Sequence, residues 1–345
     1  MKHTLSISLG LSLIVTPMSW FLSSHHDSLA PVVAVAPSQL SNGQIIQIIG
    51  EVQLERSPGR VIRPTQGTRL YPGDKLLTAS GAQVLVQCAD LTLQSVPSGQ
   101  NRGNGCPQAT EQEECTPGTY KCPHRGDIAW NSNIPYIITP RRTALLTDKP
   151  TLRWNPVAGA TSYTVNLQKN GEDFWETTVS TTEVVYSGET PLEPGASYSL
   201  IVTADTGDSS LDEQPRPGGL SFHILDENQA QRIRVAAEEI TQKDWTDATK
   251  ALAIANLYLK HDPTTPKNAL IADAIATLEE LVASKVETAA IYRTLGELYL
   301  DYLQLVQPAY QYYSKAVELA DPNNTEELTA AQAGLRQVEQ VLEEQ

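Results

Sequence analysis

A repeated helical pattern in the last third of the 345-residue chain most constrains its fold. From Tyr292 to Tyr299, apolar and small residues recur at helical spacing, and a second run places Ala309, Tyr313 and Ala316 on one face. Asp321-Pro322 then ends the pattern. A single helix pair of this kind cannot bury its apolar face alone, so it stacks on neighbouring helices. We therefore expect a layered helical region with a groove that binds other chains.

Capping signals extend the helical pattern from Asp226 to the end of the chain. Asp226 with Gln229 resembles a capping box, and so does Asn324 with Glu327, while Thr265-Pro266 marks another helix start. The pattern predicts helices over residues 227–242, 245–261, 266–284, 287–303, 306–320 and 325–343. Because the loops between them are short, we expect consecutive helices to pack against one another in antiparallel pairs.

The later helix pair resembles a tetratricopeptide repeat, a helical hairpin of about 34 residues. Tyr292, Leu295, Gly296 and Tyr299 fall at the four first-helix positions, and Ala309, Tyr313 and Ala316 fall at the second-helix positions after one extra residue. Because glycine is small, Gly296 would let the paired helix approach closely. A weaker earlier copy uses Ala251, Ala255, Tyr258, Ala274, Leu278 and Leu281. Since about three repeats are usually needed, the flanking helices would act as caps.

The tetratricopeptide resemblance implies a concave surface that binds a peptide or protein. The first helices would line it with Asn256, Lys260, Arg293, Glu297 and Asp301. The last helix would turn its carboxylates to water, namely Glu326, Glu327, Glu339, Glu343 and Glu344. The alternative is that the five groove residues are ordinary solvated side chains, because charged helix faces usually are.

Residues 40–130 show the short apolar runs and turns typical of small β-sheets. Gln44–Val52 is rich in isoleucine, and Val84–Cys88 and Leu91–Gln94 flank Ala89-Asp90 as the strands of a hairpin would. The motif that follows Leu70, with Pro72-Gly73-Asp74 and then Leu76 and Thr78, resembles the periplasmic domain of FecR-type proteins. Leu91 follows Asp90 where that family has a glycine turn. The resemblance implies a small β-module in the cell envelope.

Four cysteines cluster in the same region, at Cys88, Cys106, Cys115 and Cys122. An even, clustered set in an exported chain indicates two disulfides, for which three pairings exist. We favour Cys88–Cys106 and Cys115–Cys122, because each closes a short loop in a Gly- and Pro-rich segment. The alternative is a metal site formed by the last three cysteines and His124, but the zinc spacing C-x2-C does not occur.

The N-terminus has the features of a signal peptide. Lys2 and His3 precede an apolar stretch, Leu5–Val15, which Pro17 ends. The prediction is a signal peptide over residues 1–36 and a periplasmic or extracellular location. An uncleaved anchor that continues to Leu22 is the alternative, although the apolar stretch is short for a membrane span, which needs about 20 residues.

The pattern of strands and turns over residues 135–225 predicts a β-sandwich of immunoglobulin or fibronectin type. Arg153-Trp154 supplies an early tryptophan, Tyr163–Leu167 alternates with period two, and Asn170-Gly171 is a hairpin turn. Tyr198–Ala204 is a late strand with the same alternation. The aromatic residues are expected to pack in the core, the alternative being an exposed platform for sugars.

The order of these segments resembles exported proteins of cyanobacteria. The stretch Pro140–Leu146, with the sequence Pro-Arg-Arg-Thr-Ala-Leu-Leu, followed by Leu152-Arg153-Trp154, supports that likeness. It implies an architecture of β-modules followed by helices and an exported compartment, and it implies no activity.

Composition and motifs argue against several functions. The net charge of -15 disfavours nucleic acid, because an acidic surface repels phosphate. The six histidines are scattered, and no metalloprotease, serine-hydrolase or phosphate-loop motif occurs. The pairs Glu238-Glu239 and Glu279-Glu280 are interpreted as helix surface charge, although a carboxylate pair across a cleft stays possible. We expect no enzyme activity, no cofactor and no metal.

The sequence thus predicts a multi-domain β plus α protein: a FecR-like β-domain at 40–130, an immunoglobulin-like β-sandwich at 135–225 and a tetratricopeptide-like all-α domain at 227–345. The leading functional hypothesis is a non-catalytic envelope scaffold or adaptor that binds a protein or peptide partner through its helical groove. The alternatives are binding of cell-wall polysaccharide or a small ligand through the β-modules, or a cryptic hydrolase.

Overall fold

The computed structural model describes residues 41–56, 59–108, 131–213, 220–261 and 269–343. The predicted signal peptide, the pair Cys115–Cys122 and His124 lie outside these residues. Gln39–Gln345 form one compact unit, which is the part described below.

Two four-stranded antiparallel sheets form the N-terminal part of this unit, and we call them the N-terminal sheets. Their strands are β1 (Gly43–Ile49), β2 (Val52–Arg56), β3 (Arg60–Ile62), β4 (Arg69–Leu70), β5 (Lys75–Thr78), β6 (Gln83–Cys88), β7 (Leu93–Val96) and β8 (Asn101–Gly103). One sheet has the order β4-β1-β6-β7 and the other β3-β2-β5-β8. Ile45 and Val86 from the first sheet and Leu54 and Leu76 from the second share one core. This core follows from the alternation of apolar residues along each strand.

The predicted hairpin at Ala89-Asp90 is confirmed, with strands shifted by up to two residues. β6 pairs with β7 so that Val84 lies opposite Val96. Leu91, which the sequence assigned to the second strand, lies instead in the turn with a φ of 67°. Asp90 stabilises this turn, because its carboxylate accepts hydrogen bonds from the backbone N–H and the hydroxyl of Thr92.

The disulfide predicted between Cys88 and Cys106 is confirmed. It joins the end of β6 to the segment that follows β8, so it links the two N-terminal sheets covalently. Asn42 and Asn104, both buried, exchange a side-chain hydrogen bond beside it, with Asn104 Nδ2 donating to Asn42 Oδ1 at 2.9 Å.

A second β-module follows, also built from two sheets. Its strands are β9 (Ile137–Thr139), β10 (Ala144–Leu145), β11 (Thr151–Trp154), β12 (Tyr163–Lys169), β13 (Glu172–Val179), β14 (Glu183–Val185), β15 (Ser197–Ala204) and β16 (Ser221–Ile224). The larger sheet has the order β10-β16-β15-β12-β13 and the smaller β14-β11-β9. All of these pairs are antiparallel except β10 with β16.

The core of the second β-module contains the aromatic residues that the sequence placed there. Trp154, Tyr163 and Tyr198 are all buried, and the rings of Trp154 and Tyr163 meet edge to face at 5.6 Å. The predicted hairpin at Asn170-Gly171 is confirmed between β12 and β13. Both residues have positive φ, 54° and 82°, as a type I′ turn requires.

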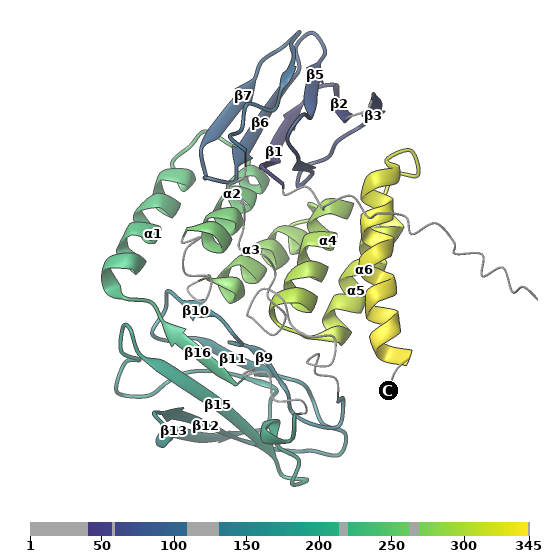
Figure 1. The fold of residues 1–345 in the computed structure, drawn as a ribbon. Coiled ribbons are helices and arrows are strands. Elements are labelled where there is room, and N and C mark those ends of the chain that lie inside the picture. The colour runs from purple at the N-terminus through teal and green to yellow at the C-terminus, as the bar shows by residue number, and fades with distance from the viewer. Residues whose placement is uncertain (1–40, 57–58, 109–130, 214–219, 262–268, 344–345) are drawn as a thin grey trace, which may run out of the picture. The chain divides into compact units, whose positions relative to one another are not determined.

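Six helices complete the unit (Figure 1). They are α1 (Glu227–Thr241), α2 (Asp247–Lys260), α3 (Ile271–Ala283), α4 (Ala289–Glu297), α5 (Val306–Leu319) and α6 (Thr325–Glu343), and a π-helical turn, η4 (Leu298–Tyr302), continues α4. Each helix contacts the next along the chain. The helix count and most boundaries agree with the sequence pattern. The predicted start of the third helix at residue 266 is wrong, since Ala269 and Leu270 precede it outside the helix.

Caps explain where several helices begin. The carboxylate of Asp226 accepts hydrogen bonds from the backbone N–H groups of Asn228 and Gln229 at the start of α1. Thr246 caps α2 and Thr288 caps α4 in the same way. Leu270 before α3 provides no such side chain, which explains why the sequence misplaced that boundary.

The helices share apolar cores with both β-parts. Ile46 of β1 belongs to the core cluster built by α2 to α6, as do Ile134 and Tyr136, just before β9. Ala144 and Leu225 of the second β-module pack with Ile233 of α1. The helical region is therefore the element against which both sets of sheets bury part of their apolar surface. No helix in the described ranges is long and apolar enough to cross a bilayer.

Candidate functional site

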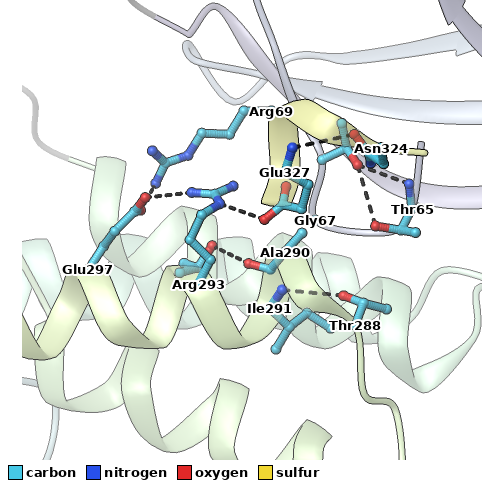
Figure 2. A network of polar contacts seen from close by, with 12 residues as sticks. Thr65, Gly67, Arg69, Thr288, Ala290, Ile291, Arg293, Glu297, Asn324 and Glu327 are labelled. Atoms are coloured by element: carbon cyan, nitrogen blue, oxygen red, sulfur yellow. Dashed lines mark hydrogen bonds and ion pairs between the residues drawn. The ribbon is translucent and has the colours of Figure 1, made fainter. Parts of the chain in front are cut away.

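The predicted groove residues Arg293 and Glu297 form a buried ionic network with the N-terminal sheets (Figure 2). Arg293 on α4 contacts Glu297 one turn further on, and its Nε donates to Glu327 Oε1 on α6 at 2.6 Å. Glu297 also pairs with Arg69 on β4. The prediction that Glu327 faces water is wrong, because it is buried against Arg293. Two carboxylates and two guanidinium groups thus balance one another at this contact.

Burial and charge act in opposite directions on this network. Burial by itself would lower the pKa of Arg293, but Glu297 and Glu327 raise it above its ordinary value. Burial would raise the pKa of Glu297, but Arg293 and Arg69 hold it below its ordinary value. Arg293 and Glu297 are therefore both charged in the folded protein.

The beginnings of α4 and α6 contact the loop between β3 and β4. The hydroxyl of Thr288 donates to the carbonyl of Gln66 at 3.1 Å, and Asn324 Nδ2 donates to the carbonyl of Arg63 at 3.4 Å. A Cβ on Gly67 would lie 3.1 Å from the Cβ of Ala290, so the loop and helix approach closely here. Figure 2 shows Gly67 above Ala290.

Asn256, a third predicted groove residue, also contacts the N-terminal sheets. Its Nδ2 donates to Gln87 Oε1 on β6 at 3.0 Å, and Gln87 Nε2 reaches the carbonyl of Ala253 at 3.5 Å. Both side chains are buried. The surface that the resemblance assigns to a partner is therefore covered by β6 at Asn256 and by β4 at Glu297, while Arg293 is paired with Glu297 and with Glu327 of α6.

Lys260 and Asp301, the remaining two, are half-buried near Arg69. Burial and the charge of Arg69 lower the pKa of Lys260 to about 8. Burial and the charge of Glu297 raise the pKa of Asp301 to about 7. Both shifts follow from loss of water at the contact between helices and N-terminal sheets.

The seven residues assigned to the repeat core lie inside the helical region. Tyr292, Leu295, Gly296, Tyr299, Ala309, Tyr313 and Ala316 are all buried. Tyr313 lies between two glycines, because a Cβ on Gly296 would meet its ring at 2.9 Å and a Cβ on Gly334 at 2.1 Å. The expectation that Gly296 permits close approach of the paired helix agrees with this contact, and Gly334 extends it to α6.

An open pocket of about 290 Å³ lies where the second β-module meets the helices, and we call it the module–helix pocket. Strand residues Arg153 and Glu183 line one side, and Asp273 and Glu279 of α3 and Tyr299 of η4 line the other. Apolar side chains that include Ile138, Leu145 and Ile275 complete it. A concave, partly apolar site with a few convergent polar groups is the usual form of a binding site.

Two tyrosines hold Glu279 in place. The hydroxyls of Tyr299 and Tyr312 donate to Glu279 Oε1 at 2.7 and 2.6 Å, and the two rings stack with centroids 5.3 Å apart. Burial first, and then the neighbouring charge of Glu279, raise the pKa of both tyrosines, so they remain hydrogen-bond donors. Glu279 Oε2 is 3.9 Å from Arg153 Nη2, beyond hydrogen-bond distance, and can accept from another donor.

Two buried polar atoms at the pocket have no hydrogen-bond partner among the described residues, namely Asp273 Oδ2 and Arg153 Nε. Burial raises the pKa of Asp273 to about 7, against the smaller opposing effect of its own backbone N–H and that of Leu146. A buried acceptor without a donor is costly, so such groups in folded proteins usually serve a ligand, water or a strained site.

Arg141, which also lines the pocket, links the loop after β9 to Glu213 and to Leu303. It is completely buried and forms a two-pronged ion pair with Glu213, in which Nη1 donates at 2.9 Å. Its Nε donates to the carbonyl of Leu303 at 2.6 Å, which ties the loop after β9 to the end of η4. The positive charge of Arg141 is thereby balanced by Glu213, and it adds no free charge to the pocket.

The sequence did not identify this pocket. It assigned Glu279-Glu280 to surface charge, and only Glu280 is exposed. The position of Glu279 four residues after the buried Ile275 could have indicated an inward-facing carboxylate. Arg153 was noted only beside the core residue Trp154. The lining contains no histidine, cysteine or serine, and the described residues contain no metal-binding cluster of three or more His, Cys, Asp or Glu.

Comparisons with known proteins assign no family. No family model matches the chain, and no curated protein matches it. Among solved structures, the chain is similar to a β-1,2-glucanase from Parabacteroides distasonis at 8% sequence identity and a TM-score of 0.22. That alignment covers 87% of this chain and 59% of the glucanase chain. A score this low supports no statement about fold or activity.

Proposed function

We propose that this protein is a non-catalytic adaptor of the cell envelope that binds a segment of a partner protein at the module–helix pocket. The observation that carries the proposal is the pocket itself, in which Arg153, Asp273 and Glu279 offer polar atoms that the described residues leave partly unpaired. Glu279 is fixed by two tyrosines, so its acceptor is oriented before any partner arrives.

The architecture supports an adaptor. We interpret the N-terminal sheets as the FecR-like module, the second β-module as immunoglobulin-like, and the helices as tetratricopeptide-like. The first-helix face of such helices is the usual place for a peptide, but here Asn256 and Glu297 contact the N-terminal sheets, and Arg293 is paired with Glu297 and Glu327. We therefore place the partner at the open pocket on the side of the second β-module, which Asp273 and Glu279 line together with strand residues such as Arg153.

The compartment belongs to the same proposal. The Cys88–Cys106 disulfide suits an oxidising environment, and residues 1–36 carry the pattern of a signal peptide. Trp154, Tyr163 and Tyr198 are buried in the core of the second β-module, and the half-buried Phe174 and Trp175 pack against that core, so these rings form no fully exposed platform for sugars. The lining offers no serine, cysteine or histidine for a nucleophile–base pair, so the hydrolase alternative would have to use two of its carboxylates, such as Glu183 and Asp273.

The test blocks the pocket without touching its polar groups. Ala276 lines the pocket and is exposed, so Ala276→Trp should fill its mouth. Ala333 on α6 is an exposed helical alanine that does not line the pocket, and Ala333→Trp is the matched control. The tagged full-length protein is exported by cells, crosslinked chemically to its partner and then purified. The wild type and Ala333→Trp should recover the same partner, and Ala276→Trp should lose it. Undiminished recovery by Ala276→Trp would contradict the proposal.

A further inference from the structure

Arg153 and Glu279 form an open charge pair in the module–helix pocket. Arg153 Nη2 on β11 and Glu279 Oε2 on α3 are 3.9 Å apart, and both residues line the pocket. Because this distance is longer than a hydrogen bond, the two atoms do not satisfy one another. Their side chains are 37% and 28% exposed, so a ligand in the pocket can reach both.

The hydrogen bonds around the pair leave a donor and an acceptor available. Tyr299 and Tyr312 both donate to Glu279 Oε1, and no described residue donates to Oε2 within hydrogen-bond distance. Arg153 Nη2 reaches the hydroxyl of Tyr299 only at 3.5 Å, and Arg153 Nε has no acceptor among the described residues. The carboxylate is therefore oriented before a ligand arrives, which lowers the cost of binding.

The charges of the pair favour a neutral ligand group. A cation bound to Glu279 Oε2 lies close to the guanidinium of Arg153, and an anion bound to Arg153 lies close to the carboxylate of Glu279. Like charges at such distances repel, and more strongly where water is partly excluded. A neutral group that donates to Glu279 and accepts from Arg153 uses both atoms without this repulsion.

A primary carboxamide has the geometry that the pair requires. Its carbonyl oxygen and one of its N–H groups point to the same side, with the oxygen and nitrogen about 2.3 Å apart. Hydrogen bonds of about 2.7–3.2 Å from these two atoms can reach protein atoms that are 3.9 Å apart. A trans backbone peptide cannot do this, because its C=O and N–H point in opposite directions. Among protein side chains, asparagine and glutamine carry the primary carboxamide.

The rest of the lining suits a single side chain with a short apolar stem. The pocket volume of about 290 Å³ lies at the lower limit of small-ligand pockets, which run from about 300 to 1,000 Å³. The side chains of Ile138, Leu145 and Ile275 offer no hydrogen-bond partner, so a sugar, with hydroxyls around its ring, would leave some of them unpaired there. The methylene groups of asparagine or glutamine are buried against these residues without that cost.

We infer that the module–helix pocket binds the carboxamide of a glutamine or asparagine side chain from the partner, with Arg153 Nη2 donating to its oxygen and Glu279 Oε2 accepting from its nitrogen. This inference rests on the proposed function, whose partner segment it specifies.

The first experiment measures binding of blocked tripeptides to the full chain by ligand-observed NMR, which detects weak binding. Gly-Gln-Gly should bind more tightly than Gly-Glu-Gly, its isosteric anion, and more tightly than Gly-Lys-Gly, a cation. The lysine peptide tests whether the other lining carboxylates, Glu183 and Asp273, outweigh the charge of Arg153. Failure of Gly-Gln-Gly to bind, or equal or tighter binding of either charged peptide, overturns the inference.

Two further probes carry related groups. Propionamide has the same carboxamide without a peptide, and an affinity equal to that of Gly-Gln-Gly overturns a partner segment as its source. D-glucose has adjacent hydroxyls, which also place a donor beside an acceptor. Tighter binding of glucose than of Gly-Gln-Gly overturns the amide.

Replacing the carboxylate of the pair should change which peptide binds. In Glu279→Gln, Tyr299 and Tyr312 can still donate to the side-chain oxygen, so the new NH2 group faces the pocket. The ratio of Gly-Gln-Gly affinity to Gly-Glu-Gly affinity should fall by about tenfold or more, because a ligand carboxylate then meets two donors. Glu280→Gln, at the exposed neighbour outside the lining, should leave the ratio unchanged. An unchanged ratio in Glu279→Gln overturns the role of Glu279.

Arg153→Met tests the other member of the pair. Methionine keeps an apolar stem but removes the donor and the charge, so Gly-Gln-Gly should bind about tenfold more weakly. Gly-Lys-Gly should bind more tightly, because the opposing charge is gone. A purely structural role for Arg153 would weaken all three tripeptides alike, and that result overturns the inference. Thermal unfolding of each variant checks that it folds.

The outcomes also distinguish this inference from the proposed function. If Gly-Gln-Gly fails to bind but Ala276→Trp still abolishes partner capture, the pocket binds its partner through another group, and the carboxamide alone is wrong. If Ala276→Trp leaves capture intact, the proposed function is wrong, whatever the tripeptides do.

Discussion

Arg69 on β4 and Glu297 on α4 form an ion pair although 228 positions separate them in the sequence. The pair joins the N-terminal sheets to the helical region. Glu297 also pairs with Arg293, which in turn pairs with Glu327 (Figure 2). A face that the repeat pattern assigned to an external partner is therefore used to hold the chain's own modules together.

Arg293, at the buried centre of this network, should contribute far more to the stability of the fold than Arg69 at its exposed end. Arg293→Met leaves Glu297 and Glu327 buried without their main partner, so the free energy of unfolding should fall by about 3–5 kcal/mol. Arg69 is more exposed, so Arg69→Ala should cost about 1 kcal/mol or less. Chemical denaturation of both variants measures the two values. Similar losses in both would show that the charge of Arg293 is not the determinant.

The packing around Tyr313 predicts an unusual effect for a helical glycine. Gly334→Ala normally favours a helix by about 1 kcal/mol. Here the new Cβ would lie 2.1 Å from the Tyr313 ring, so overpacking should make the protein less stable by a net of about 1–3 kcal/mol. In a Tyr313→Leu background the same change should cost less. Thermal or chemical unfolding of the four proteins gives the coupling, and a stabilised single variant would contradict the contact.

The disulfide should stabilise the N-terminal sheets through the loop that it closes. Cys88 and Cys106 are 18 positions apart, and replacing both with alanine should lower the free energy of unfolding by about 3 kcal/mol. The double variant is preferable to a reductant, which would also act on the other two cysteines. Urea unfolding followed by circular dichroism measures the loss, and an unchanged midpoint would argue that β6 and β8 need no covalent link.

Asp301 predicts how stability changes with pH. Its pKa is raised to about 7 in the folded protein, by burial and by Glu297, from an ordinary value near 3.8. The folded state therefore holds a proton that the unfolded state has lost, and this stabilisation is full below about pH 4 and disappears as the pH rises through 7. Relative to Asp301→Asn, the wild type should lose stability between these limits. Parallel curves for the two proteins across this range would contradict the assignment.

Local signals were enough to predict much of the fold. The turn Asn170-Gly171 needs two residues that accept positive φ, and it occurs where the sequence placed it. Asp226 caps α1 with its own side chain, so that helix start can be recognised without any tertiary contact. The start of α3 could not be recognised from the sequence, since Leu270 carries no capping group. The position of Leu270 depends on packing against the second β-module.

The sequence by itself determined the order of the modules, the number of helices and the Cys88–Cys106 pair, because turn chemistry, apolar periodicity and loop length are properties of neighbouring residues. The tertiary structure decided which surfaces stay open. Arg69 and Glu297, or Arg153 and Glu279, come together only when distant segments pack. A pattern among neighbouring residues does not show which distant residues will be close in space. Ion pairs and pockets of this kind depend on the three-dimensional approach of whole modules, so the covered groove and the module–helix pocket became visible only in the folded chain.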